Sequence, residues 1–267
     1  MKNRHYSFLF SIIGLLVFFP VAFLIVTSFA LQWTWPQILP TEWSTIGWNA
    51  LIEEPKLFLA LRTSIGIGAI VVFINLAIGF PAAKVLAFQS FKGKSFIEAF
   101  LLMPILIPGL AVAMGLHLTM IRIGVADHWA GVALVHLVPT IPYTIKIFRS
   151  GFERVGSFYE LQALSLGASQ KEVFTSIYLP QLITSIRSAT FLIFVISLSQ
   201  YALTAIIGGG NVVTLAMIYF PYLSSVNNAV IASFSLLFAG IPLLFILIIE
   251  IVIRMFIPYR SLTNTQQ

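Results

Sequence analysis

Six long stretches of this chain contain no charged residue, and they limit its fold more than any other feature. A helix of about 20 apolar residues spans the roughly 30 Å hydrocarbon core of a bilayer. Charged residues make up 9% of the chain, against about 25% in an ordinary soluble domain. The sequence therefore predicts an all-α membrane protein, a bundle of six transmembrane helices at Phe8–Ala30, Thr63–Ala83, Ala99–Ile121, Trp129–Ile145, Ser188–Ile207 and Ala229–Ile249.

Lysine and arginine residues are distributed unevenly between the connections, which predicts an orientation. With a cytoplasmic N-terminus, twelve of the basic residues fall on the cytoplasmic side, and only Lys56, Arg62 and Arg122 fall outside. Cytoplasmic loops usually carry such an excess. We therefore expect a multi-pass protein of a bacterial cytoplasmic (inner) membrane with both termini in the cytoplasm. The outer connection is instead acidic and rich in tryptophan, and a helix on the outer surface is plausible there.

The first stretch follows the basic sequence MKNRHYS, as the apolar part of a signal peptide would. It runs for 23 uncharged residues, longer than the roughly 7 to 15 residues of a signal peptide. No small-x-small cleavage pattern precedes Gln32. We expect a retained first helix.

Several kinds of functional site find no support in the residues. The chain has no cysteine, so it offers neither disulfides nor thiol ligands. Gly93-Lys94-Ser95 resembles the end of a phosphate-binding loop, but the glycine required five positions before Gly93 is replaced by Phe88. The four histidines lack metal-ligand spacing, and the scattered positive charge forms no nucleic-acid stripe. We expect no catalytic residue, no metal, no cofactor and no nucleic-acid partner.

Prolines interrupt several of the predicted spans, at Pro81, Pro104, Pro108, Pro139 and Pro142. In water each would cost about 3 kcal/mol in a helix interior, but a membrane bundle can satisfy the freed carbonyls. They indicate either packing bends or the kinked helices of a protein that moves solutes. The run Gly208-Gly209-Gly210 predicts the start of an uncharged outer loop over 208–228.

The longest cytoplasmic connection, 150–180, contains strong helix signals. Ser157 with Glu160, and Ser169 with Glu172, have the spacing of capping boxes and predict two helix starts. Gly167 lies where the first helix must stop, and Pro180 lies where a new helix can begin. In the first of these helices, Leu161, Leu164 and Ala168 would form the apolar face. Ala163 and Gly167 would permit close backbone approach to that helix. A helix this short needs docking to be stable.

The same segment resembles the EAA signature of ABC importer permeases of the binding-protein-dependent type. Gly167, followed after nine residues by Ile177-x-Leu179-Pro180, matches the second half of that signature in spacing, and Ala163 fills the second alanine position. Leu161 stands where the family has its glutamate, Gln162 where it has its first alanine, and Glu160 is displaced by one residue. The third span and the run after the fifth resemble the branch of polyamine, ferric-iron and thiamine permeases.

The resemblance implies an ABC transporter permease that moves a small solute by alternating access, without its own ATPase site. Its implied partners are a cytoplasmic ABC ATPase dimer, which binds the ATP, a second permease subunit in a homo- or heterodimer, and an external solute-binding protein, and the chain itself lies in the lipid bilayer. A secondary transporter and an intramembrane enzyme are the alternatives, but the spans offer neither an ion relay nor a nucleophile with its base. The implied ATPase-coupling residues of loop 157–180 are Glu160, Leu161, Ala163, Gly167, Ala168, Ile177, Leu179 and Pro180.

On this interpretation the chain has four parts. Residues 1–31 form the N-terminal transmembrane helix, 32–59 an external loop, 60–257 the permease core with five further transmembrane helices and coupling loop 150–180, and 258–267 a cytoplasmic tail. Glu160 has two open roles, as a helix cap or as a contact with the ATPase.

The fifth span contains the densest polar cluster of the predicted membrane segments. Such side chains either hold helices together, at about 0.6 kcal/mol each, or line a solute path. We expect Gln200 and Ser197 to share a face, and the candidate path residues are Ser197, Gln200, Tyr201 and Thr204. Many members of the polyamine branch have an acidic residue at the position of Gln200, so its neutrality argues against direct charge contact with a cationic solute. His117 and His136 fit helix-to-helix hydrogen bonding better than a path.

Overall fold

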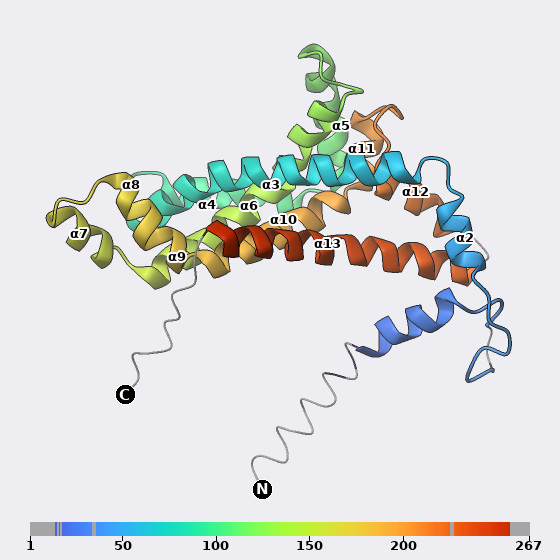
Figure 1. Ribbon diagram of the computed structural model, residues 1–267. Coiled ribbons are helices and arrows are strands. Elements are labelled where there is room, and N and C mark those ends of the chain that lie inside the picture. The colour runs from blue at the N-terminus through green and yellow to red at the C-terminus, as the bar shows by residue number, and fades with distance from the viewer. Residues whose placement is uncertain (1–13, 15, 17, 34–35, 225–226, 257–267) are drawn as a thin grey trace, which may run out of the picture. The chain divides into compact units, whose positions relative to one another are not determined.

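The computed structural model describes residues 14, 16, 18–33, 36–224 and 227–256. Within this part of the chain the secondary structure is helical, apart from one isolated bridge between Ala30 and Trp43. The chain forms two compact units, unit 1 with Met1–Leu61 and Leu215–Ile241, and unit 2 with Arg62–Thr214 and Pro242–Gln267. The helices of Figure 1 are α2 (Ile46–Ile52), α3 (Leu57–Phe88), α4 (Lys94–Leu106), α5 (Gly109–Arg122), α6 (Trp129–Val155), α7 (Phe158–Ser165), α8 (Gln170–Glu172), the π-helical turn η1 (Val173–Tyr178), α9 (Leu179–Gln181), α10 (Ile183–Leu198), α11 (Tyr201–Ile207), α12 (Leu215–Tyr222) and α13 (Asn228–Phe256).

Three helices of the described chain, α3, α6 and α13, are long and apolar enough to cross a bilayer. They contain the predicted second, fourth and sixth spans. The count rises to five if each of two bent helix pairs is one span, so the predicted six are not reproduced directly. Residues 8–13, 15 and 17 of the predicted first span lie outside the described residues, and the rest of it contains a shorter apolar helix, Phe18–Ser28. The outcome is a multi-helix membrane protein whose spans are less regular than predicted.

The predicted third span is not one helix. α4 and α5 meet at an angle of 104°, because Ile107 is extended (φ −86°, ψ 132°) directly before Pro108. A proline ring disfavours helical geometry in the residue before it, so the chain leaves the helix at this point. Pro81, by contrast, lies inside α3, which continues past it. Proline therefore breaks one span and leaves the other continuous.

The predicted fifth span is also divided. α10 begins at Ile183, five positions earlier than expected, and ends at Leu198, after which α11 begins at Tyr201. A bend of 72° at Leu182 separates α10 from the helical run 170–181. Neither proline nor glycine lies at the break between α10 and α11, which therefore has a different physical cause from the break in the third span.

Unit 1 contains α2, α12 and the first half of α13. The expected outer loop 208–228 is therefore partly helical, a correction explained by the apolar run of α12 and its contacts with α13. Tyr222 stacks on Phe234 with ring centroids 4.4 Å apart, and its hydroxyl donates to Glu54 at 2.9 Å. α2 provides the helix that the acidic, Trp-rich connection was expected to contain. An aromatic and polar contact layer thus holds this unit together.

Unit 2 is built around α6. This helix packs against α4, α10 and α11, and α11 also packs against α5. Phe80 of α3 contacts the rings of Phe148 and Phe152 on α6 edge-on, with centroids 5.5 Å and 4.9 Å apart. α7 and α8 lie at the end of α3 that carries Lys84 (Figure 1).

Candidate functional site

The stop signal of α7 is formed as the sequence predicts. Gly167 has φ +90°, and its N–H donates to the carbonyl of Leu164 at 3.0 Å, while Ala168 N–H donates to Ala163 at 3.0 Å. This is the Schellman pattern, which requires a left-handed residue and therefore favours glycine. No atom of this chain lies within 4 Å of where a Cβ on Gly167 would be, so the close backbone approach that Ala163 and Gly167 were expected to permit is not made within the chain at Gly167. Gly167 serves the turn alone.

The second predicted capping box is present. Ser169 N–H donates to the Glu172 carboxylate at 2.7 Å, and Glu172 N–H donates to the Ser169 hydroxyl at 3.3 Å. The helical run then passes through η1 and α9, with Pro180 in the first turn of α9. Proline cannot donate to the preceding turn and its ring crowds that turn, so a wider π-helical turn before Pro180 fits its requirements. The helix therefore continues through Pro180 and bends at Leu182.

The first predicted capping box is wrong. Ser157 makes no side-chain cap bond, and Glu160 turns away from it toward α3. The carboxylate of Glu160 lies 2.6 Å from Lys84 Nζ and accepts a hydrogen bond from the Tyr178 hydroxyl at 2.5 Å. The cap amide would give the carboxylate one neutral donor, whereas here it has two partners, one of which is a full positive charge, and this explains the choice. Lys84, Glu160 and Tyr178 are called the anchor below.

The environment of Glu160 favours its charged form. Partial burial alone would raise the pKa of this carboxyl, but hydrogen bonds from Lys84 and Tyr178 and the charge of Lys84 outweigh it and lower the pKa below its ordinary value. The Lys84 ammonium also lies 4.9 Å from the centre of the Tyr178 ring. The Glu160 carboxyl is therefore ionised at neutral pH.

The anchor determines which face of α7 points inward. Glu160, Ala163 and Leu164, at helical spacing, are half-buried. Leu161 was expected on this apolar face, but 61% of it is exposed. One position along a helix turns a side chain by about 100°. Exposed apolar residues therefore cover the outward face, namely Phe158, Tyr159, Leu161 and Leu166, and they are called the apolar outer face of α7.

Some of the other predicted coupling residues of segment 157–180 are exposed, and some are partly buried. Pro180 and Gly167 are exposed, whereas Ala168 and Ile177 are half-buried. Leu179 lines an apolar groove of about 360 Å³ together with Phe80, Phe174 and other residues of α3, α6 and α10. Tyr178, which sequence reasoning missed, is 1% exposed and packs edge-on against Phe152.

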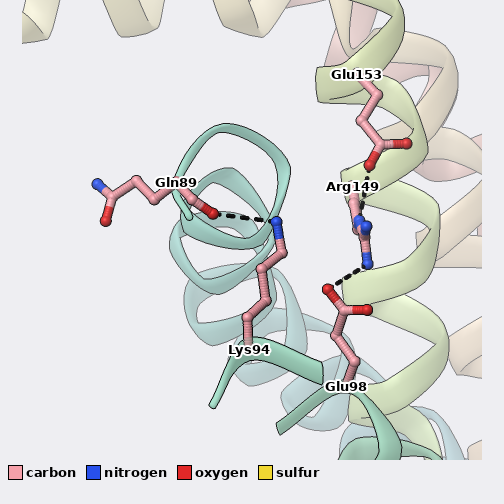
Figure 2. A network of polar contacts seen from close by, with 5 residues as sticks. All are labelled: Gln89, Lys94, Glu98, Arg149 and Glu153. Atoms are coloured by element: carbon pink, nitrogen blue, oxygen red, sulfur yellow. Dashed lines mark hydrogen bonds and ion pairs between the residues drawn. The ribbon is translucent and has the colours of Figure 1, made fainter. Parts of the chain in front are cut away.

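Two further ion-pair clusters stabilise unit 2. Figure 2 shows Arg149 of α6 between Glu98 of α4 at 2.8 Å and Glu153 at 2.7 Å, with Lys94 donating to the Gln89 carbonyl at 3.1 Å. On α13, Glu250 pairs with Arg254 at 2.8 Å, and Arg187 of α10 lies 2.7 Å from the same Glu250 carboxylate. These clusters join helices that are distant in sequence.

A cavity of about 400 Å³ lies where the bundle is least regular. Its lining includes residues at the break between α4 and α5, residues at the break between α10 and α11, and Pro139 of α6. None of the lining residues is charged. Its polar side chains are Tyr143, Ser199 and Gln200, and the remaining lining residues are Pro104, Ile105, Ile107, Gly109, Val112, Val138, Pro139, Ile196 and Leu203. The chemistry available is hydrogen bonding in an apolar frame.

The candidate path residues separate in the structure. Gln200 lines the cavity, but Ser197, Tyr201 and Thr204 do not. Ser197 and Thr204 instead bond His136, which is 1% exposed, at 2.9 Å and 3.1 Å. The expected shared face of Ser197 and Gln200 is therefore wrong, because the helix breaks between them. Tyr143 and Ser199 belong to the cavity instead, and no sequence signal marked Tyr143.

The expectation for the two span histidines is met at His136, which bonds helices to one another. His117 is half-buried. Among the described residues, no group of three or more His, Asp or Glu side chains is placed to hold a metal ion. The structure therefore presents two features for function, the anchored segment 157–180 and the uncharged cavity.

Sequence relatives of this chain are permease proteins. The molybdate/tungstate transport system permease protein WtpB of Pyrococcus abyssi is 33% identical over 149 residues, 56% of this chain and 60% of that protein. The putrescine transport system permease protein PotI of Escherichia coli is 25% identical over 205 residues, 74% and 73% of the two chains. The sulfate permease protein CysT of Salmonella typhimurium is 24% identical over 228 residues, 77% and 82%. The chain thus spans 60% of the length of the molybdate/tungstate permease.

Solved structures share the fold. A chain of a bacterial ABC transporter involved in import of the acidic polysaccharide alginate superimposes with a TM-score of 0.69 at 13% identity, covering 97% of this chain and 96% of that one. A chain of the MetNI methionine ABC transporter in an inward-facing conformation gives 0.59 at 15% identity, covering 77% and 99%. The family model of the binding-protein-dependent transport system inner membrane component matches residues 75–260. The chain therefore belongs to this family of transport-system membrane components.

Proposed function

We propose that this chain is the permease subunit of an ATP-driven importer and that it moves a small solute, delivered by an external binding protein, by alternating access. The anchored α7 with its apolar outer face is the observation that carries this proposal. A helix of eight residues is unstable by itself in water. It is held here by the anchor, while Leu161 and Leu166 remain 61% and 83% exposed.

The apolar outer face is the proposed seat for a separate cytoplasmic ATPase. Exposed apolar surface rimmed by polar residues is typical of a protein interface, and the EAA-like segment occupies this position. Twelve basic residues on the same side of the predicted topology support a cytoplasmic location. In this assembly the ATPase dimer binds the ATP, and a second permease subunit, identical or different, completes the pathway.

Alternating access requires that nucleotide binding favour one conformation over another. Segment 157–180 supplies the linkage, because movement of the docked α7 is passed to α3 through Lys84 and to α10 through Leu182. Leu161, Ala163, Gly167, Ala168, Ile177, Leu179 and Pro180 shape or support the docked surface. Glu160 acts within the chain, by holding α7, rather than by touching the ATPase.

A charge on the apolar outer face tests the docking. Leu161→Asp should leave the fold intact, since the side chain is exposed, but should prevent burial against an apolar partner surface. The expected result is loss of the ATPase from the purified complex and loss of solute-stimulated ATP hydrolysis in proteoliposomes. Gln170→Asp, which introduces the same charge at an exposed residue beyond Gly167, is the control and should retain both. Normal hydrolysis by Leu161→Asp with the ATPase still bound would contradict the proposal.

For the solute, the uncharged cavity favours recognition by hydrogen bonds. Amide and hydroxyl groups from Gln200, Ser199 and Tyr143 can bind an oxyanion without a counter-charge, whereas a dication would be left without any carboxylate partner. Two of the relatives are named for molybdate/tungstate and for sulfate. We therefore propose a tetrahedral oxyanion as the solute class.

Uptake into proteoliposomes that contain the complete transporter tests the solute class. Radiolabelled molybdate and sulfate should be accumulated with ATP, and putrescine, the solute named for another relative, should not. Accumulation of putrescine alone would reject the oxyanion assignment while leaving the permease function intact.

A further inference from the structure

The buried imidazole of His136 connects three helical segments. It lies on α6, with Nδ1 2.9 Å from the hydroxyl of Ser197 on α10 and Nε2 3.1 Å from the hydroxyl of Thr204 on α11. The break between α10 and α11 lies between those two partners. One side chain therefore ties both sides of the break to the central helix.

The hydrogen-bond donors in this group have one consistent arrangement. The Thr204 hydroxyl donates its single proton to the Gln200 carbonyl at 2.6 Å, so it must accept from His136 Nε2–H. A neutral imidazole carries one ring proton, and Nδ1 is then an acceptor for the Ser197 hydroxyl. Three hydrogen bonds thus run in one direction, from Ser197 through His136 and Thr204 to the backbone of Gln200.

The end of this chain of bonds is an unusual turn. Gln200 has φ −77° and ψ 78°, and Tyr201 N–H donates to the carbonyl of Ser199 at 2.9 Å. These are the features of an inverse γ-turn, which an uninterrupted helix does not contain. No proline or glycine lies between Ser197 and Thr204 to force the turn. The hydrogen bonds of His136, Ser197 and Thr204 therefore distinguish this break from the one before Pro108.

We propose that His136 is a positioning residue for the solute cavity. By fixing Ser197 and Thr204, it holds the γ-turn at Gln200 and so keeps the Gln200 side chain at the cavity, where it contacts the solute. The role of Gln200 as a solute contact rests on the proposed function. The effect of His136 on the turn does not, and the two can be tested separately.

A second buried polar group on α6 provides a matched control. Thr144 lies two helical turns beyond His136 and donates to Asn75 of α3 at 2.9 Å. Both Thr144 and Thr204 are buried, and each makes helix-to-helix bonds through one hydroxyl. Valine has the same shape as threonine without the hydroxyl. Thr204→Val and Thr144→Val therefore remove comparable bonds, one at the break and one away from it.

The absence of cysteine from the chain allows position 200 to be probed directly. In a Gln200→Cys variant of the complete transporter in proteoliposomes, the rate of modification by a small water-soluble maleimide reports exposure to the cavity. Adding Thr204→Val or His136→Leu should slow modification at least about fivefold, the effect expected from losing one hydrogen bond that holds the turn. Adding Thr144→Val should leave the rate unchanged. Equal rates in all backgrounds, or equal slowing by both valine variants, would overturn the positioning role.

Transport kinetics give the second measurement, on chains that keep Gln200. Thr204→Val should raise KM for the transported solute by roughly fivefold with little change in kcat, because a contact made in the bound state is weakened. Thr144→Val should change neither. An unchanged KM for Thr204→Val, together with slowed maleimide modification in the Gln200→Cys background, would separate the two proposals, since the turn would depend on His136 while Gln200 would not contact the solute.

Discussion

Lys84 of α3 and Glu160 of α7 are 76 positions apart in the sequence, and their charged groups are 2.6 Å apart in the structure. Tyr178 completes the group with a bond to the same carboxylate. Glu160, which lies one position before the expected glutamate of the EAA-like segment, therefore binds other residues of its own chain. Its neighbour Leu161, at the position of that glutamate, faces outward.

Exchanging the two charges tests the anchor. Lys84→Glu and Glu160→Lys should each reduce solute-stimulated ATP hydrolysis by about fivefold, the effect of a partly exposed ion pair, because α7 loses its support. The double variant restores an attractive pair and should recover most of the activity, a coupling that independent residues do not show. ATP hydrolysis by the purified transporter in proteoliposomes is the measurement. A Glu160 that contacted the ATPase would give no recovery in the double variant.

Acidification should release α7. The pKa of Glu160 is below its ordinary value of 4.5, so its stabilising contribution is complete above that value and is lost as pH falls through the lowered one. Amide hydrogen exchange in α7, corrected for the intrinsic pH dependence, should therefore increase below about pH 4.5 in the chain that keeps Glu160. Glu160→Gln should show fast exchange already at neutral pH and no further step. Both chains should carry Glu172→Gln, so that the second capping box does not contribute. A step of equal size in both would point to another group.

The left-handed turn at Gly167 should tolerate few replacements. At φ +90°, a Cβ meets no neighbouring atom but is strained by its own backbone. Gly167→Ala should destabilise the end of α7 by about 1 kcal/mol, and Gly167→Asn by less, because asparagine adopts this conformation more readily. Protection of the Leu166 and Gly167 amides from hydrogen exchange measures the difference. Equal protection in both variants and the natural chain would show that the turn does not need glycine.

Two neighbouring glycines of α3 should respond in opposite ways to alanine. A Cβ on Gly68 would come within 2.7 Å of the Phe194 ring, whereas nothing lies within 4 Å of a Cβ on Gly66. Phe194 cannot easily give way, since it stacks on Phe245 with ring centroids 3.8 Å apart. Gly68→Ala should lower stability by about 1–3 kcal/mol through overpacking, and Gly66→Ala should be neutral or stabilising. The thermal midpoint of each variant in detergent measures this, and equal midpoints would count against the α3 to α10 packing.

Local signals predicted the three long helices and the turn that ends α7. Uncharged apolar stretches located α3, α6 and α13, since burial in lipid requires them. Gly167 and the box of Ser169 and Glu172 were predicted because a cap depends on residues within four positions. These features need no knowledge of distant parts of the chain.

Long-range polar contacts account for most of what the sequence did not predict. The partner of Glu160 was assigned to Ser157, three positions away, because the competing Lys84 is close only in the folded bundle. The break at Gln200 depends on His136, more than 60 positions earlier. The break at Ile107 is followed by Pro108, which the sequence shows, but whether a proline bends or breaks a membrane helix depends on the neighbours that satisfy the freed backbone groups.

The continuity of α3 has a mechanical consequence. This helix runs unbroken from Leu57 to Phe88, and Lys84 lies four positions before its end. At about 1.5 Å per residue, it is a rod of about 48 Å, stiff compared with the bent pairs α4–α5 and α9–α10. Under the proposed function, movement of a docked α7 would reach α3 through Lys84 and tilt this helix as one unit, and the bent pairs would be the places where the bundle can change its angles.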